Sequence, residues 1–121
     1  MNPILPDSEA NYWLSAMVID RDAMCAQLRD ERKASCTPES GKSCPTQILD
    51  ALTASNAEGR PFWKPMHLQP IYTEQAFVNA DGSDKDVGAD IFERGLCLPS
   101  DIKMTTEQQD KIIEIVRSCF A

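Results

Sequence analysis

The pattern of hydrophobic and polar positions near the N-terminus predicts a strand followed by a helix. Both alternating sets of side chains in Tyr12–Ile19 are largely apolar, which is typical of a strand covered along most of its length. After Asp20, the apolar residues of Arg21–Arg32 recur at helical spacing, so we expect an amphipathic helix there. The Pro-rich, polar residues 1–10 are expected to form a leader or linker before a folded domain of residues 11–121.

Two polar stretches further along the chain predict loops. Glu31–Pro45 is rich in Pro, Ser and Gly, which favour turns, so we expect residues 31–45 to form a mobile loop. Asn79–Asp86 has a similar character and predicts a second mobile loop over residues 79–86. Between the two loops, Thr46 is placed to cap a helix over Gln47–Ser55, whose apolar residues share one face.

The C-terminal third of the chain predicts two helices separated by a strand. Val87–Arg94 has the pattern of a short helix, and Gly95 is expected to end it in the left-handed conformation. Leu96–Pro99 is apolar and predicts a short buried strand. Thr105 or Thr106 is then expected to cap a final helix that has a broad apolar face.

This order of elements predicts the fold class. A strand, two helices, and then alternating strands and helices suggest a small, mostly antiparallel sheet with helices packed on it, an α/β or α+β architecture. The chain has 121 residues, which suits one domain with a modest core.

Charge and hydropathy exclude several classes of function. The net charge of −7 argues against a general nucleic-acid binder, which needs a basic face to hold phosphates. The chain has no apolar run of about 18 residues, so we expect no membrane span. Because the N-terminus lacks a basic region followed by an apolar core, we read no signal peptide and expect a cytoplasmic protein.

The five cysteines do not form a metal-binding pattern. Zinc sites use closely spaced ligand pairs, whereas this chain has no CxxC pair and only one His. We therefore expect no metal site and five reduced thiols. A disulfide between Cys36 and Cys44 is the alternative.

The candidate chemistry is concentrated in Glu58–Pro70, with the sequence EGRPFWKPMHLQP. Three prolines exclude regular helix and favour a stiff, extended segment. Arg60 and Lys64 suit phosphate or carboxylate groups, and Trp63 offers a flat face for a base or a sugar. With His67 beside them, these residues predict a binding edge for an anionic ligand.

Each of these four side chains also has a structural interpretation. A lone His is often only structural, and Arg60 and Lys64 could equally be ordinary surface cations. Trp63 could fill the core or an interface. By alternation along an extended segment, three apolar residues are expected to face inward: Phe62, Met66 and Leu68.

The same segment carries a resemblance to a known family. GRPFWKPMHLQP and the later DIFERGLCLPS (Asp90–Ser100) resemble the C-terminal small domain of the DegT/DnrJ/EryC1/StrS family of PLP-dependent sugar aminotransferases, of the pilin-glycosylation type. NYWLSAMVID (Asn11–Asp20) and MTTEQQDKIIEIVRSCF (Met104–Phe120) match the same domain in the same order. The resemblance covers nearly the whole chain apart from the two polar stretches.

The resemblance implies both a fold and a function. The chain would be the C-terminal domain of a fold-type I aminotransferase, which moves an amino group, commonly from glutamate, onto a nucleotide-linked keto-sugar. The pathway would be synthesis of surface glycan precursors, and the parent enzyme would be a homodimer formed through its large domain. Arg60, Trp63, Lys64 and His67 would contact the nucleotide-sugar substrate.

The resemblance assigns the cofactor to another part of the parent enzyme. PLP chemistry needs a lysine amine, an acidic partner and a phosphate cup, and in this family the large domain supplies them. No lysine of this chain has a context similar to the Schiff-base site. We therefore expect this chain to bind no cofactor and to be inactive alone. Its lysines are Lys33, Lys42, Lys64, Lys85, Lys103 and Lys111.

A second function remains open at this point. The chain could be a stand-alone binding or interaction module, derived from that domain and without catalytic chemistry. The missing cofactor site favours this alternative as much as it favours a domain of a larger enzyme.

Overall fold

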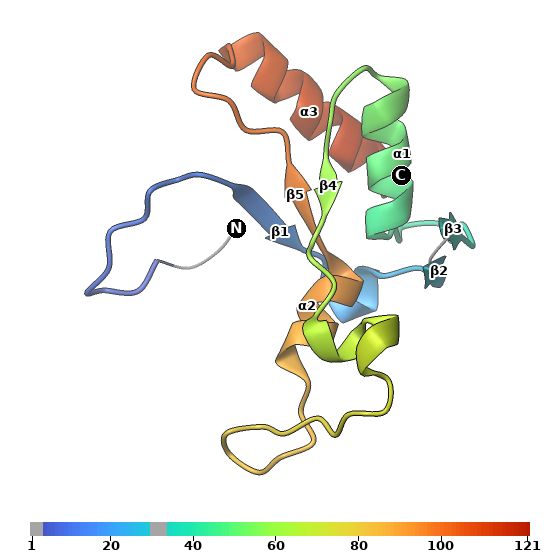
Figure 1. Cartoon of the computed structure of the whole chain (residues 1–121). Coiled ribbons are helices and arrows are strands. Elements are labelled where there is room, and N and C mark those ends of the chain that lie inside the picture. The colour runs from blue at the N-terminus through green and yellow to red at the C-terminus, as the bar shows by residue number, and fades with distance from the viewer. Residues whose placement is uncertain (1–3, 30–33) are drawn as a thin grey trace.

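A three-stranded antiparallel sheet lies at the centre of the computed structural model, which describes residues 4–29 and 34–121. Its middle strand is β5 (Gly95–Leu98), flanked by β1 (Ser15–Val18) and β4 (Arg60–Pro61) (Figure 1). In this register Cys97 lies opposite Ala16 on one side and Arg60 on the other. The buried strand predicted from Leu96–Pro99 is confirmed, and it organises the sheet.

Two helices, α1 (Pro45–Ala54) and α3 (Thr106–Ser118), lie beside the sheet and complete the core (Figure 1). The side chains of Ile48 and Leu52 from α1 and of Leu96 from β5 are fully buried. They belong to a cluster of buried residues: Ile19, Ile48, Leu52, Leu96 and Cys119. The α/β class with a small antiparallel sheet is confirmed. None of the helices in the described residues is both long enough and apolar enough to cross a bilayer.

The helix starts follow from local capping. The Thr105 hydroxyl accepts a hydrogen bond from the Gln108 backbone, and the Gln108 side chain accepts one from the Thr105 backbone, so the predicted cap of α3 is confirmed. The prediction that Thr46 caps α1 is wrong. That helix begins at Pro45, which suits the first helical position because it has no backbone N–H to leave unpaired. Thr46 is buried, and its hydroxyl donates instead to Gln27 Oε1 at 3.1 Å.

The helix predicted over residues 21–32 is also wrong. A 3₁₀ turn at Arg21–Ala23 is followed by β2 (Gln27–Arg29), which pairs with β3 (Ala34–Cys36) in a second, antiparallel sheet. Long-range backbone hydrogen bonds explain the difference, because the segment between turn and strand is tied to Ser43 in both directions: Cys25 N to Ser43 O and Ser43 N to Ala23 O, each 3.0 Å.

The loop predicted over residues 31–45 therefore contains the strand β3 and a buried end, since Ser43, Cys44 and Pro45 are buried. Parts of three predictions lie outside the described residues: the first three residues of the leader, the end of the helix over 21–32, and the start of this loop.

The N-terminal strand is shorter than the alternating pattern predicts. Tyr12 has a φ of 52°, in the left-handed region, and such a residue cannot continue a strand. The backbone N–H of Trp13 donates to Asn11 Oδ1 at 3.2 Å, which closes a turn at this point. Tyr12 and Trp13 are consequently exposed, and pairing starts only at Ser15.

The helix α2 (Val87–Arg94) has the predicted bounds but a different ending. Asp86 caps its start, because its Oδ1 accepts a hydrogen bond from the Ala89 backbone N–H at 2.8 Å. Gly95 is not a left-handed cap, since its φ is −104° and it already belongs to β5. The absence of a side chain matters for another reason. A Cβ at Gly95 would overlap the Phe62 ring, which packs against this strand.

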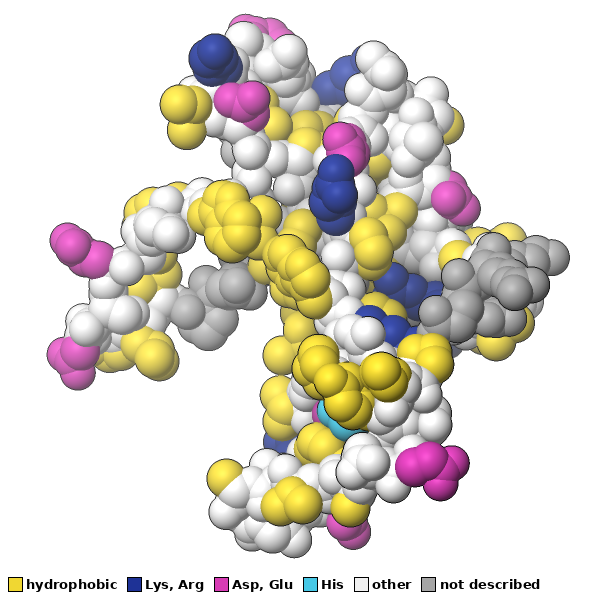
Figure 2. All heavy atoms as spheres, in the orientation of Figure 1, with side chains coloured by type: hydrophobic (Ala, Val, Ile, Leu, Met, Phe, Trp, Pro, Cys, Tyr) yellow, Lys and Arg dark blue, Asp and Glu magenta, His cyan; other side chains and the backbone are white. Residues whose placement is uncertain are grey.

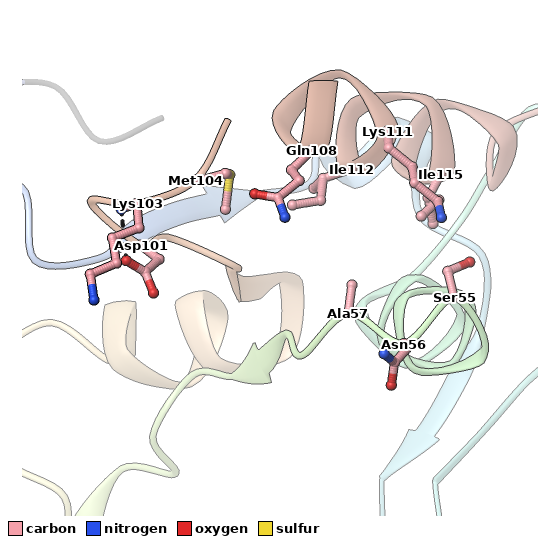
Figure 3. A pocket seen from close by; sticks show the side chains of 10 residues that line it. All are labelled: Ser55, Asn56, Ala57, Asp101, Lys103, Met104, Gln108, Lys111, Ile112 and Ile115. Carbon is pink, nitrogen blue, oxygen red and sulfur yellow. Dashed lines mark hydrogen bonds between the residues drawn. The ribbon is translucent and has the colours of Figure 1, made fainter. Parts of the chain in front are cut away.

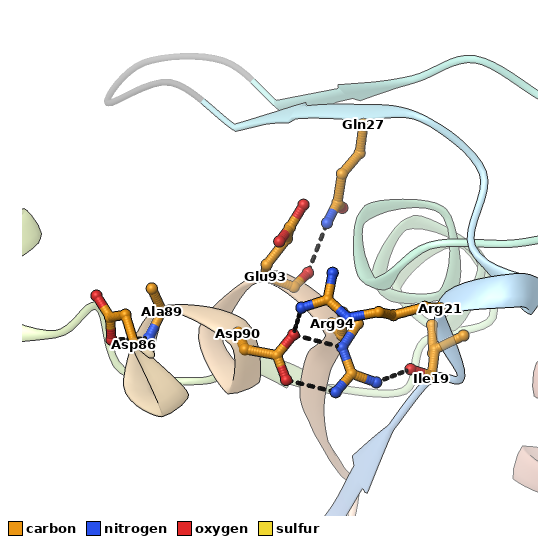
Figure 4. A network of polar contacts seen from close by, with 8 residues as sticks. All are labelled: Ile19, Arg21, Gln27, Asp86, Ala89, Asp90, Glu93 and Arg94. Atoms are coloured by element: carbon orange, nitrogen blue, oxygen red, sulfur yellow. Dashed lines mark hydrogen bonds and ion pairs between the residues drawn. The ribbon is translucent and has the colours of Figure 1, made fainter. Parts of the chain in front are cut away.

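Other parts of the chain satisfy the last carbonyls of α2, so no glycine cap is required (Figure 4). Three donors approach them: Gln27 Nε2 to Glu93 O (2.6 Å), Arg29 Nη1 to Phe92 O (2.8 Å) and Ile19 N to Arg94 O (3.0 Å). Strand β2 and the residue that follows β1 are thereby hydrogen-bonded to the end of α2.

Residues 62–86, which we call the lobe, connect β4 to α2 (Figure 1, yellow-green to yellow). The lobe contains two 3₁₀ turns, Met66–Leu68 and Pro70–Tyr72, followed by a loop. The α-helix excluded by the prolines is indeed absent between residues 58 and 70, but the segment is extended only where β4 pairs. The inward face predicted from alternation is wrong for Met66 and Leu68, which are 61% and 37% exposed, because a 3₁₀ turn does not alternate.

Candidate functional site

The candidate site is built on the segment that leaves the sheet at β4. Arg60 and Pro61 pair with Cys97 and Leu96 of the central strand, so the start of the segment is fixed to the core. The chain then enters the lobe and turns twice before it reaches α2. The predicted binding residues are therefore carried by a rigid strand end and by the first part of the lobe.

Arg60 and Trp63 are on the surface. The Arg60 guanidinium pairs with the Glu58 carboxylate, and the two side chains are 75% and 74% exposed. An exposed pair of this kind contributes little to stability, because water screens both charges. Trp63 is 67% exposed, so it does not fill the core. Both side chains are accessible to a ligand.

Lys64 is partly buried and stands just before the first 3₁₀ turn. Its backbone carbonyl accepts a hydrogen bond from Gln69 Nε2 at 3.4 Å, which spans that turn. His67 lies within this turn, and its side chain is partly buried in the lobe.

His67 has the most defined surroundings of the four predicted residues. Its Nε2 is hydrogen-bonded to Asp86 Oδ2, and each of the two side chains is 23% exposed. The imidazole also packs against the Phe77 ring, with centroids 4.6 Å apart and planes at 43°. A partly buried imidazole with a carboxylate on one nitrogen keeps its other nitrogen, Nδ1, for a ligand.

Asp86 is the site residue that the sequence analysis missed, because it treated this aspartate as part of a polar loop. The backbone N–H of Ala89 and the hydrogen bond from His67 lower the pKa of the Asp86 carboxyl, so it is ionised at neutral pH. An Asp directly before a helix is a recognisable cap. Its pairing with a His 19 positions earlier leaves no signal in the sequence.

Arg60 and His67 contact different carboxylates, in different parts of the molecule. Arg60 turns to Glu58 beside β4, whereas His67 turns to Asp86 at the start of α2. The four predicted residues therefore follow one another along a surface edge and are not gathered in one enclosed cavity. The arrangement suits an extended ligand better than a small buried one.

Two hollows in the described part of the molecule lie away from this edge. One, of about 970 Å³, runs between residues 11–15 and the start of α3, and its lining includes Tyr12, Trp13 and Ile102. The other, of about 500 Å³, lies between the end of α1 and α3 (Figure 3). None of the four predicted residues lines either hollow.

Of these two hollows, only that of Figure 3 is lined by lysines, together with an aspartate, so it is the one whose residues can be compared with a PLP site. Lys103, Lys111 and Asp101 all stand on its exposed rim, and no aromatic side chain lines it. PLP sites enclose the reactive lysine and pair the pyridine nitrogen with an acid. These residues do not fit the cofactor. The described residues also contain no group of three His, Cys, Asp or Glu side chains that could hold a metal ion.

Comparison with known proteins gives two findings. The model of the DegT/DnrJ/EryC1/StrS aminotransferase family matches residues 24–117. The chain is also 39% identical over 79 residues to a Bacillus subtilis (strain 168) protein, EpsN, whose name describes it as a pyridoxal phosphate-dependent aminotransferase. That match covers 63% of this chain and 19% of the relative, so the chain spans about a fifth of the length of that protein.

Proposed function

The chain belongs to the DegT/DnrJ/EryC1/StrS aminotransferase family, and we propose that it is the C-terminal small domain of a nucleotide-sugar aminotransferase. The complete enzyme would use PLP and move an amino group, commonly from glutamate, onto a keto-sugar for a surface glycan precursor. We place this reaction in the cytoplasm. The observation that carries the proposal is the edge with Arg60, Trp63, Lys64 and His67, where an exposed Arg, a partly buried Lys and a hydrogen-bonded imidazole follow one another.

The chemistry of these side chains suits a nucleotide-sugar. Arg60 and Lys64 carry charges that complement a diphosphate, and the exposed face of Trp63 suits a base or a sugar ring. His67 would contact a sugar hydroxyl through Nδ1. PLP, when bound elsewhere in the enzyme, supplies the electron sink for amino-group transfer. This chain would bind and orient the substrate.

We assign the larger hollow to contact with the cofactor-binding domain of the enzyme. Its apolar lining is unusually exposed, at 77% for Tyr12, 71% for Trp13 and 101% for Ile102, and exposed apolar patches of this kind mark interfaces. The chain spans 19% of its relative, so a cofactor-binding region of the family is the occupant that fits best. The same region would form the homodimer. A second copy of this chain is the competing occupant. Sedimentation of the isolated chain as a dimer in analytical ultracentrifugation would reveal it.

The test uses a chimeric enzyme, called the joined enzyme below, in which this chain replaces the matching segment of the Bacillus subtilis relative. We expect Arg60→Ala and Lys64→Ala each to lower kcat/KM for a nucleotide-linked keto-sugar by roughly ten- to a hundredfold, because each removes about 1.5–3 kcal/mol of charge-assisted binding. His67→Ala should lower it about two- to tenfold, because a hydrogen bond between neutral groups contributes about 0.5–1.5 kcal/mol. The melting temperature and the absorbance of bound PLP should stay unchanged.

Two surface cations outside the edge serve as matched controls. Arg117→Ala on α3 and Lys103→Ala should leave kcat/KM unchanged, since both side chains are exposed and lie outside the segment. Normal kinetics in all three edge variants would show that the segment is only scaffold. A joined enzyme that folds with bound PLP but turns over no nucleotide-sugar would contradict the assigned substrate class.

The alternative function, a binding module without chemistry, shares one expectation with our proposal. The isolated chain should bind no PLP and show no transaminase activity, an expectation supported by the exposed positions of Lys103 and Lys111 in the hollow of Figure 3. Borohydride treatment with PLP followed by mass spectrometry checks this. One stoichiometric lysyl adduct would contradict it. Activity of the joined enzyme then separates the two functions, since a module without chemistry would not support turnover.

A further inference from the structure

The pairing of His67 with Asp86 joins two segments that the sequence keeps apart. His67 lies in the 3₁₀ turn Met66–Leu68, and Asp86 is the residue that caps α2. The two oxygens of Asp86 have different partners: Oδ2 contacts His67 Nε2, and Oδ1 accepts the backbone N–H of Ala89 at 2.8 Å. The carboxylate therefore cannot rotate away from His67 without also losing its hydrogen bond to the start of the helix.

The helix that holds Asp86 is itself fixed to the core. Within α2, Arg94 Nε donates to Asp90 at 2.8 Å, and Arg94 Nη1 donates to the carbonyl of Ile19 at 2.5 Å (Figure 4). Arg21 pairs with the same Asp90 from the turn after β1. Asp86 is thus held in place inside an otherwise exposed region, and its hydrogen bond to His67 restrains the imidazole.

An ionised carboxylate also decides where the proton of a neutral imidazole resides. Asp86 is acceptor-only because its pKa lies below the ordinary value, so the nitrogen that faces it must carry the hydrogen. Nε2 is then the donor, and Nδ1 has a free lone pair. The Phe77 ring, 4.6 Å away between centroids, limits rotation of the imidazole plane.

We propose that Asp86 is a positioning residue, which holds His67 as the Nε2–H tautomer so that Nδ1 accepts a hydrogen bond from a hydroxyl of the substrate. This rests on the proposed function, in which His67 contacts the nucleotide-sugar. It specifies the contact: the ligand group at this point is a donor such as a sugar hydroxyl, and not a phosphate oxygen, which a lone pair would repel.

The tautomer can be measured directly in this chain, because it contains a single His and its ring nitrogens give unambiguous ¹⁵N signals. At about pH 9, where an imidazole is ordinarily neutral, we expect a protonated Nε2 and an unprotonated Nδ1. Asp86→Asn should invert this pattern. Its single oxygen remains with the Ala89 N–H, so the amide N–H₂ faces Nε2 as a donor and moves the ring proton to Nδ1.

Two further variants separate orientation from folding. Asp86→Ser keeps a good helix cap but removes the acceptor for His67, so the tautomers should mix while the amide signals of α2 stay in place. Asp84→Asn changes a neighbouring, exposed aspartate and should alter neither. The inference is overturned when Asp86→Asn retains the original tautomer, or when Asp86→Ser keeps the Nε2–H signal as protected from exchange as before.

Kinetics in the joined enzyme distinguish this inference from the proposed function. Asp86→Asn should lower kcat/KM roughly tenfold or more, because a donor on Nδ1 then meets a donor on the substrate. Normal kinetics of His67→Ala, together with the expected tautomer inversion, would reject the substrate contact but keep the positioning by Asp86. A clear loss of kcat/KM in His67→Ala, without tautomer inversion in Asp86→Asn, would keep the substrate contact but reject the positioning by Asp86.

Discussion

The core and the lobe of this domain are stabilised by different forces. In the sheet and the two helices beside it, the side chains of Ile48, Leu52 and Leu96 are fully buried. From residue 53 to residue 94, by contrast, no residue is buried. Ile71 and Val78 in the lobe are 79% and 84% exposed, and hydrophobic side chains gather on its surface (Figure 2).

Polar contacts stabilise the lobe in place of a core. The pair of His67 and Asp86 closes it across its base, and Asn79 Nδ2 donates to the Lys85 carbonyl at 2.9 Å within its loop. Hydrogen bonds near water contribute much less than apolar burial, so the lobe can change without unfolding the domain. The core therefore fixes the start and the end of the lobe, and the exposed side chains of the lobe are free to serve in binding.

The largest contrast is expected between two isoleucines. Ile48→Ala removes a fully buried side chain from α1 and should lower the free energy of unfolding by about 2–5 kcal/mol. Ile71→Ala makes the same chemical change in the exposed lobe and should stay within about 0.5 kcal/mol of the starting protein. Urea unfolding followed by circular dichroism measures both. Equal losses would mean that the lobe has a core of its own.

Gly95→Ala tests the contact between the two regions. The new Cβ would overlap the ring of Phe62, the first residue of the lobe, and the carbonyl of Ile91. Overpacking of this kind typically costs about 1–3 kcal/mol, and here it should also displace the start of the lobe. Gly82→Ala is the opposite case, because nothing lies within 4 Å of its Cβ and only its φ of 71° opposes the change.

Chemical shifts of His67 report on the lobe in the Gly95→Ala protein. We expect them to move together with the loss of stability. If stability falls while the imidazole signals stay unchanged, the lobe is positioned by α2 alone and not by its contact with β5.

A smaller effect is expected from Asp90, which joins α2 to the core. Hydrogen bonds from Arg94, together with the charges of Arg94 and Arg21, lower the pKa of the Asp90 carboxyl. A lowered pKa contributes stability above the unfolded value of about 3.9, and this is lost as the pH falls through the folded value. Asp90→Asn should therefore be less stable than the starting protein at pH 7, and the difference should shrink below about pH 4.

Urea midpoints of both proteins at several pH values between 2 and 7 test that sign. A difference that persists unchanged at the lowest pH would show that the amide disturbs packing and not the ion pairs.

The smallest effect concerns thiol reactivity, with no change in stability. All five cysteines lie outside the lobe: Cys25, Cys36, Cys44, Cys97 and Cys119. Burial raises the pKa of four thiols, those of Cys36, Cys44, Cys97 and Cys119, so exposure and not the pKa distinguishes Cys36. Cys36 is less buried, so it should react first with a thiol reagent in the native protein, and five thiols should react after denaturation. Four buried thiols reacting as fast as Cys36 would indicate an open core.

The sequence alone determined the elements that depend on neighbours in the chain. The bounds of α2, the capped start of α3 at Thr105 and the buried strand β5 all follow from local capping and from short apolar runs. The family resemblance, carried by two motifs and both ends of the domain, is likewise a property of the chain and is confirmed. Local signals of this kind need no partner from elsewhere in the molecule.

Only the tertiary structure decided the elements that depend on distant partners. The apolar spacing in residues 21–32 suits a helix, but hydrogen bonds to Ser43 and side-chain contacts with the end of α2 favour a turn and a strand. Gly95 needs no left-handed φ because Gln27 and Arg29 satisfy the helix carbonyls, and its lack of a side chain instead accommodates Phe62. The pairing of His67 with Asp86 arises in the same way, because a 3₁₀ turn and a helix cap meet only after the chain has folded.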